Sequence, residues 1–125
     1  MYDLTVILPN RPGTLASFGE TLAEAGINIE GCCAISEGAD TIVHALVVNA
    51  TLARSRLESA GFVVQEEHPA ISFYVSGEDR PGILARYARR IAEAGVNIDR
   101  TYLAAGSRLA FVTADNAKAR TAIRA

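Results

Sequence analysis

The chain has 125 residues, of which 50% are hydrophobic and 21% charged, and its formal net charge at pH 7 is −2. This composition is typical of a folded globular protein and excludes an intrinsically disordered one. A slightly acidic chain without tryptophan also lacks the basic footprint and the stacking platform with which proteins bind nucleic acid.

Targeting signals and metal sites are equally weak in the sequence. No apolar run approaches the roughly 20 residues that a membrane-spanning helix needs, and the first residues do not resemble a signal peptide. We therefore expect a cytoplasmic protein that binds neither membrane nor nucleic acid. The adjacent Cys32 and Cys33 suit neither a zinc site nor an ordinary disulfide, so we interpret them as reduced strand residues, with a reactive thiol as the minor alternative.

The first half of the chain predicts alternating strands and helices. Tyr2, Leu4 and Val6 alternate with other positions, which indicates a half-buried strand. Leu15, Phe18 and Leu22 follow the spacing of one helix face, with Pro12 in the first helical turn and Gly26 at the end. The further predicted elements are strands at 27–35 and 41–48, a helix at 51–60 with Leu57 facing the core, and a strand at 62–66.

The second half repeats the first, at a shift of 69 residues through the first helix and of 66 residues later, where Arg54 and Leu57 match Arg120 and Ile123. Residues 10–30 lie over 79–99, and 11 of these 21 pairs are identical, which indicates an internal duplication. The repeat predicts a strand around 71–75, a helix from Pro81 to Gly95 with Leu84, Tyr87 and Ile91 on its core side, strands at 96–104 and 108–113, and a helix at 116–124 with Ile123 facing the core.

The order of elements predicts an α+β fold of two tandem ferredoxin-like βαββαβ units, in which helices cover one face of an antiparallel sheet. We expect domains at 1–68 and 69–125. The sequence ends where the second unit should begin its last strand, so we expect that unit to be short and its sheet edge to be covered. Either a second chain in a homodimer, which we favour, or the strand at 62–66 would cover it.

The repeated stretch resembles a known family. The run Asn10-Arg11-Pro12-Gly13 and its copy Asp79-Arg80-Pro81-Gly82, each followed by Ala-Gly-x-Asn-Ile, are similar to the ACT domain, the amino-acid-sensing module of metabolic enzymes. The second copy is especially similar to the serine-binding regulatory domain of 3-phosphoglycerate dehydrogenase. The resemblance covers nearly the whole chain and implies a regulatory protein, with no cofactor, that binds a small amino acid and acts on a metabolic enzyme.

Elementary chemistry favours an amino-acid site at such a loop. A turn from strand to helix directs unpaired N–H groups and the positive end of the helix dipole outward, where a carboxylate can bind. The resemblance implies that the loop and the Asn opening the next strand, supplied by the neighbouring domain, hold the ligand, which pairs Asn10 with Asn97 and Asp79 with Asn28. The expected ligand-binding residues are Asn10, Arg11, Pro12, Gly13, Asn28, Asp79, Arg80, Pro81, Gly82 and Asn97.

Several of these residues also have purely structural explanations. Asn10 and Asp79 suit a helix cap, and Asn28 and Asn97 follow a glycine that ends a helix, where Asn is common. The serine-binding pattern has a histidine two residues before the loop, where this chain has Leu8 and Gly77, so serine is not implied. We interpret the arginines 86, 89 and 90 as an exposed helix face, given the overall acidity.

Three classes of function follow from the sequence. The first is an amino-acid-binding regulatory module, and the second is an ACT scaffold that has lost its ligand and acts as a regulatory subunit. The third is a small enzyme, which we rank lowest. In the sequence His44 and His68 each stand alone, without companions for acid-base or nucleophilic catalysis. The sequence therefore predicts a protein that is not an enzyme.

Overall fold

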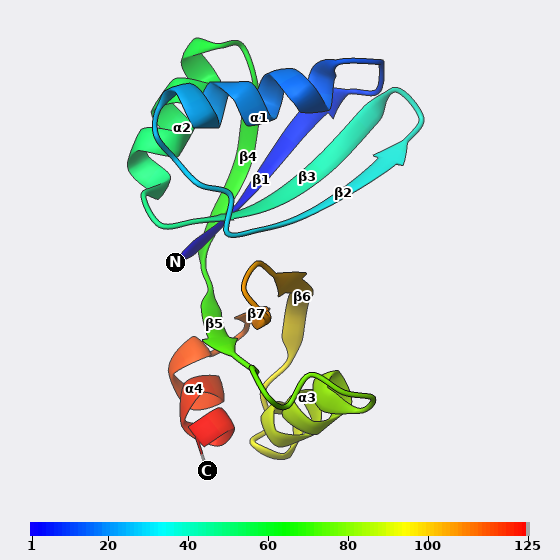
Figure 1. Ribbon diagram of the computed structural model, residues 1–125, viewed down its shortest axis with the longest axis vertical. Helices are drawn as coiled ribbons and strands as arrows, with labels where there is room; N and C mark the ends of the chain where they lie inside the picture. The colour runs from blue at the N-terminus through cyan, green and yellow to red at the C-terminus, as the bar shows by residue number, and fades with distance from the viewer. Residues whose placement is uncertain (125) are drawn as a thin grey trace. The chain divides into compact units, whose positions relative to one another are not determined.

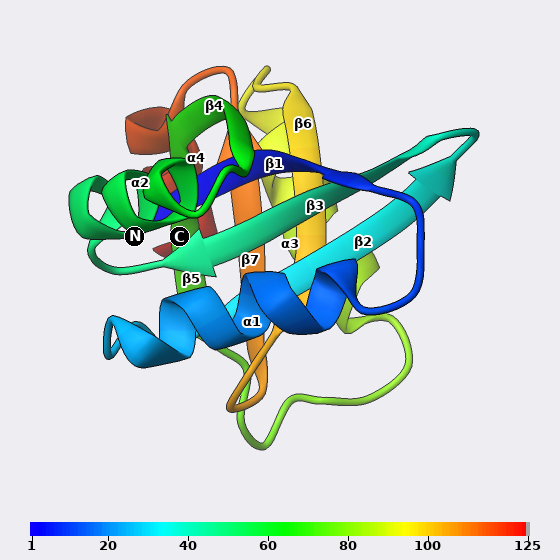
Figure 2. The same ribbon diagram turned by 90° about the horizontal axis from the view of Figure 1, so that it is seen from above.

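The computed structural model describes residues 1–124 and divides the chain into two compact units, Met1–His68 (unit 1) and Pro69–Ala125 (unit 2). Each unit combines helices with an antiparallel arrangement of strands (Figures 1 and 2). Residues 1–124 contain four helices and seven strands, so the expected α+β class is confirmed.

Unit 1 contains two helices that pack on one face of a four-stranded sheet (Figure 1). The strand order is β4-β1-β3-β2, and β3 pairs antiparallel with both β1 and β2. Alternate residues of β1, namely Leu4, Val6 and Leu8, are buried against Phe18 of α1 and Leu57 of α2. The elements are β1 (Tyr2–Pro9), α1 (Thr14–Glu24), β2 (Gly31–Glu37), β3 (Asp40–Val47), α2 (Ala50–Ser59) and β4 (Val63–Pro69).

Unit 2 repeats this plan with three strands among its described residues, in the order β6-β7-β5. The central strand β7 pairs antiparallel with both neighbours. Its Leu109 and Phe111 pack with Ile71 of β5, Ile91 of α3 and Ala119 of α4. The elements are β5 (Ile71–Tyr74), α3 (Ile83–Glu93), β6 (Ile98–Ala104), β7 (Arg108–Thr113) and α4 (Asn116–Arg124).

The largest error in the predicted element bounds concerns β2, which begins at Gly31 and not at residue 27. The N–H of Ile27 donates to the carbonyl oxygen of Leu22 at 2.9 Å and so still closes helix α1. Ile27 and Ile29 then pack against the core from a segment that is not a strand. Their β-branched character reflects this packing and not strand pairing.

A second error concerns the helix faces. Leu15 and Leu84 were expected to lie on the core side of their helices, but they are 51% and 42% exposed. Both lie in the first turn, directly after an exposed loop, and the apolar side of each helix reaches the core only one turn later, at Phe18 and Tyr87. The expected burial of Leu22, Leu57 and Ile91 is confirmed.

Candidate functional site

The repeated loops connect β1 to α1 in unit 1 and β5 to α3 in unit 2. In both loops the residue that precedes the helix is a left-handed glycine, Gly13 at φ 89° and Gly82 at φ 95°. These glycines are the N-cap residues, and no side chain caps either helix. Pro12 and Pro81 consequently lie before the N-cap, whereas the sequence predicted them in the first helical turn. A residue with a Cβ atom is strained in this conformation, which explains the glycine.

The uncapped helices leave amide groups available. In unit 1 the N–H of Ser17 donates to Gly13 at 3.0 Å, whereas the amides of Leu15 and Ala16 have no acceptor within residues 1–124. The equivalent amides in unit 2, those of Leu84 and Ala85, are in the same situation over the same range. Such N–H groups, at the positive end of the helix dipole, favour a bound carboxylate or other anion.

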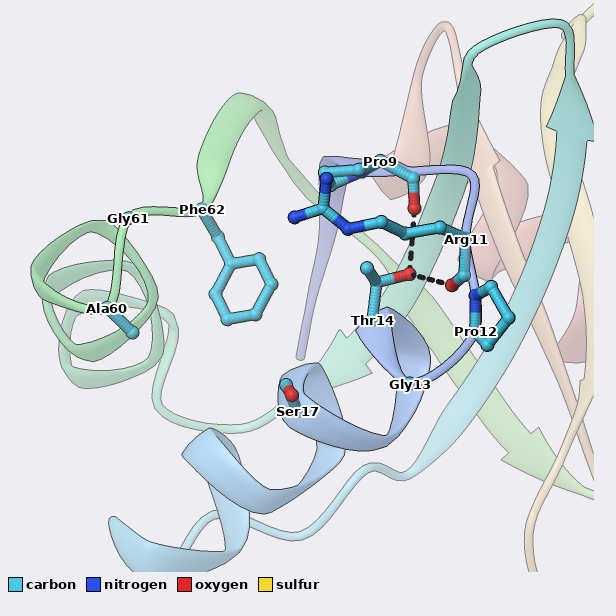
Figure 3. A pocket seen from close by; sticks show the side chains of 9 residues that line it. All are labelled: Pro9, Arg11, Pro12, Gly13, Thr14, Ser17, Ala60, Gly61 and Phe62. Carbon is cyan, nitrogen blue, oxygen red and sulfur yellow. Dashed lines mark hydrogen bonds between the residues drawn. The ribbon is translucent and has the colours of Figure 1, made fainter.

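In unit 1 the loop borders a cavity of about 410 Å³ (Figure 3). One wall is the turn between α2 and β4, which carries Phe62, and the guanidinium of Arg11 extends across the loop toward that ring. The hydroxyl of Thr14 bridges the carbonyl oxygens of Pro9 and Arg11, at 2.7 and 3.1 Å, and so fixes the loop. The lining residues are Pro9, Arg11, Pro12, Gly13, Thr14, Ser17, Ala60, Gly61 and Phe62.

Asn10 has a structural role that the sequence did not predict. Its side-chain amide donates to the carbonyl oxygen of Gly38 at 2.9 Å, and its backbone N–H donates to Ala39 at 2.9 Å. Both bonds fasten the loop to the turn between β2 and β3. Asn10 is therefore neither a helix cap nor part of the lining of the cavity beside Arg11.

Asn28 lies elsewhere in unit 1. Its side-chain amide donates to the carboxylate of Glu30, and it lines a separate hollow of about 270 Å³ beside Asn49, the N-cap of α2. Within unit 1 the structure thus brings Arg11, Pro12 and Gly13 together around one cavity and leaves Asn28 at another.

The predicted residues of unit 2 are also divided. Asp79 lines a hollow of about 230 Å³ together with Leu103, whereas Asn97 lines one of about 390 Å³ beside helix α3. The side-chain amide of Asn97 donates to Asp99 at 3.1 Å. Arg80, Pro81 and Gly82 are exposed on the loop itself.

Unit 2 contains a polar cluster that the sequence reasoning missed. The carboxylate of Glu78 accepts hydrogen bonds from Nη1 of Arg86 at 2.8 Å and from the hydroxyl of Tyr87 at 3.0 Å. The bond from Tyr87 is the main cause that lowers the pKa of Glu78. Burial raises the pKa of Tyr87, and the Glu78 bond adds to this effect. A loop residue that reaches the second turn of a helix leaves no periodic signal in a sequence, so only the structure reveals this cluster.

Metal binding and nucleophilic chemistry concern other side chains of residues 1–124. No three His, Cys, Asp or Glu side chains within that range gather closely enough to hold a metal ion. Partial burial, followed by Cys33 and Asp3, raises the pKa of the Cys32 thiol, which opposes a nucleophilic role. No helix in the same range has the length and apolar character to cross a membrane.

Comparisons with known proteins give the fold its context. No protein-family profile and no curated protein sequence match the chain. Among solved structures, protein BT0572 from Bacteroides thetaiotaomicron has 23% identity and a TM-score of 0.78, with 98% of this chain and 85% of that chain covered.

Two further solved structures are similar to the chain. The regulatory subunit of aspartate kinase from Thermus thermophilus has 20% identity and a TM-score of 0.74, over 98% of this chain and 87% of that one. The corresponding subunit from Thermus flavus has 21% identity and a TM-score of 0.69, over 98% and 88%. At these identities the likeness establishes a shared fold.

Proposed function

We propose that the chain is a regulatory protein of two ACT domains, 1–68 and 69–125, that binds a small L-amino acid and modulates a metabolic enzyme or pathway. The fold shared with regulatory subunits of aspartate kinase and the duplicated Arg-Pro-Gly loop both support this proposal. The single observation that carries it is the cavity of about 410 Å³ beside the uncapped start of α1, with the Arg11 guanidinium at its edge.

The cavity offers each group that an amino acid requires. The carboxylate would accept hydrogen bonds from Arg11, which lines the cavity and whose planar fork suits carboxylates, beside the available amides of Leu15 and Ala16 at the start of α1. The hydroxyl of Ser17 is an acceptor for the ammonium, and the ring of Phe62 provides an apolar wall for the side chain. The volume lies within the range of about 300–1,000 Å³ that is usual for small-ligand pockets.

The remaining predicted residues belong to the proposal through the ACT resemblance. In that arrangement Asn97 would complete the site of the first loop, and Asn28 that of the second loop, which contains Asp79, Arg80, Pro81 and Gly82. The special similarity of the second copy to the domain of 3-phosphoglycerate dehydrogenase remains part of this proposal. A cytoplasmic homodimer that does not catalyse a reaction is the form in which we expect the protein to act.

A second candidate function is a structural ACT subunit without a ligand. One observation favours it: the side-chain amides of Asn10, Asn28 and Asn97 all donate to groups in their own units. A residue that is held in this way does not need a ligand to satisfy its hydrogen bonds.

A thermal-shift screen against the twenty L-amino acids separates the two functions. A ligand that binds only the folded protein raises the melting temperature. We expect one or a few amino acids at millimolar concentration to raise it, and we expect Arg11→Ala to remove that rise. If no amino acid changes the melting temperature, the sensor is contradicted and the structural subunit is favoured.

A further inference from the structure

The two repeated loops differ in the residue that precedes them. Unit 1 has Pro9 at the end of β1, and Pro9 lines the cavity beside Arg11. At the shift of 69 residues the equivalent residue in unit 2 is Glu78, so a neutral ring is replaced by a carboxylate.

Glu78 also contacts a residue that is equivalent to another lining residue of that cavity. Its partners Arg86 and Tyr87 lie at the positions of Ser17 and Phe18 in unit 1. Between positions 9 and 17 unit 1 has open space, because both residues border the cavity. Between positions 78 and 86 unit 2 has a carboxylate that is bonded to a guanidinium.

The guanidinium and hydroxyl that hold Glu78 are the kind of groups that would bind the carboxylate of a ligand. Tyr87 is 7% exposed, and its hydroxyl donates a hydrogen bond to Glu78 at 3.0 Å. The guanidinium groups of Arg86 and Arg90 lie 5.6 and 5.4 Å from the centre of the Tyr87 ring. Glu78 is thus the anion of a small cationic cluster on helix α3.

The two loops also differ in their charged residues. Residues 9–13 of unit 1 carry one charge, the positive charge of Arg11. Residues 78–82 carry two negative charges, on Glu78 and Asp79, against the positive charge of Arg80. Because Arg86 neutralises the charge of Glu78, the second loop together with Arg86 has no net charge, whereas the first loop has the positive charge of Arg11 to attract a ligand carboxylate.

We infer that Glu78 is a built-in carboxylate that closes the loop of unit 2 to carboxylate ligands, so that the chain binds one α-amino acid, in unit 1. This inference rests on the proposed function and makes it more specific. The duplicated loop is present in both units, but in unit 2 Glu78 already occupies the donors of Arg86 and Tyr87. In unit 1 the lining residues Arg11 and Ser17 would provide ligand contacts, beside the amides of Leu15 and Ala16 at the start of α1.

The test is isothermal titration calorimetry of the full chain with each L-amino acid that raises the melting temperature. We expect one molecule per chain. Arg11→Ala weakens binding about ten-fold or more, as the loss of one charge-assisted contact implies, whereas the control Arg54→Ala, at an exposed ion pair outside the cavity lining, retains the affinity. Two molecules per chain overturn the inference while the proposed function stands.

A reciprocal variant transfers the closing residue to unit 1. Pro9 is exposed at the end of a strand, and its carbonyl oxygen is the group that bonds to Thr14, so a substitution there retains that contact. We expect Pro9→Glu to weaken binding about ten-fold or more by adding a like charge, and the isosteric neutral control Pro9→Gln to retain it. Unchanged binding in Pro9→Glu contradicts the inference, and a complete absence of binding in the unsubstituted chain contradicts both the inference and the proposed function.

Discussion

At the scale of single residues, the N-cap glycine and the interior glycine of α1 differ in the backbone conformation that they require. Gly13 adopts φ 89°, whereas Gly19 lies inside the helix, and a Cβ atom at either position would meet nothing within 4 Å. Backbone conformation alone therefore decides the effect of alanine at each site. The sequence shows both as glycines of one helix, and it does not distinguish the cap from the interior.

We expect Gly13→Ala to lower the free energy of unfolding by about 1–2 kcal/mol, the cost of a left-handed residue with a side chain. Gly19→Ala should raise it by about 0.5–1 kcal/mol, because alanine loses less backbone entropy in a helix. Urea denaturation followed by circular dichroism measures both. The same sign of change in the two variants would contradict the assigned N-cap conformation.

The Glu78 and Tyr87 pair predicts a dependence of stability on pH. Because the pKa of Tyr87 is raised, the folded chain keeps this proton to a higher pH than the unfolded chain does. The free energy of unfolding should therefore fall as the pH rises above the usual pKa of tyrosine. The pKa of Glu78 is lowered, so the stability that it contributes is present above the usual pKa of glutamate and is lost as the pH falls below it.

Ultraviolet titration of the tyrosines tests this pair directly. We expect the pKa of Tyr87 to lie above the usual value for tyrosine, and Glu78→Gln to move it back toward that value, because the carboxylate no longer favours the protonated phenol. Tyr87→Phe should remove the transition with this raised pKa. A raised pKa that persists unchanged in Glu78→Gln would show that Glu78 is not the partner of Tyr87.

At the scale of secondary-structure elements, hydrophobic spacing predicted more than the capping residues did. Strand β7 and helix α4 have the predicted bounds, because both are short apolar or amphipathic runs between clear turns. Helix α1 was also expected, yet its apolar spacing included Leu15, which is exposed. Periodicity gives the side of a helix that faces inward, and it does not say where along the helix the sheet begins.

The contrast between Leu22 and Leu15 tests this point. Leu22 is fully buried against the unit 1 core, so Leu22→Ala should lower the free energy of unfolding by about 2–5 kcal/mol. Leu15→Ala should lower it by about 1 kcal/mol or less, because half of the side chain is already exposed. Thermal denaturation of the two variants compares them, and equal losses would be inconsistent with the described start of α1.

Helix α2 differs from α1 and α3 because a side chain does cap it. The Oδ1 atom of Asn49 accepts a hydrogen bond from the N–H of Leu52 at 3.1 Å. We expect Asn49→Ala to lower the free energy of unfolding by about 0.5–2 kcal/mol, and Asn49→Asp to retain most of the stability. Equal losses in the two variants, measured by urea denaturation, would argue against the cap. The absence of such a cap on α1 is what leaves its amides available.

At the scale of the whole molecule, the small net charge conceals two opposite units. Unit 1 has nine acidic residues and three arginines, a net charge of −6, and unit 2 has nine basic and five acidic residues, a net charge of +4. Arg86 and Arg89 are exposed, as the sequence predicted for this face of α3, and Arg90 is half-buried. Arg86 pairs with Glu78, and Arg90 donates to the carbonyl oxygen of Ile123, which links α3 to α4.

The sequence predicted the residues of the repeated loop but not the geometry of the cavity that the loop borders. The repeat identified Arg11, Pro12 and Gly13, which line the cavity, because a duplicated motif can be recognised without any structure. It could not identify Phe62, because that wall comes from a turn far along the chain. It also could not show that the side chain of Asn10 donates to the carbonyl oxygen of Gly38. Like the position of Phe62, this contact depends on tertiary packing.

The central claim is that an amino acid binds at the start of α1 in unit 1. The most direct measurement is an amide ¹H–¹⁵N NMR titration of the full chain with an amino acid that raises its melting temperature. We expect the cross-peaks of Leu15 and Ala16 to shift with the ligand concentration, while those of Leu84 and Ala85 stay in place. Shifts confined to Leu84 and Ala85, or equal shifts in the two units, would contradict it.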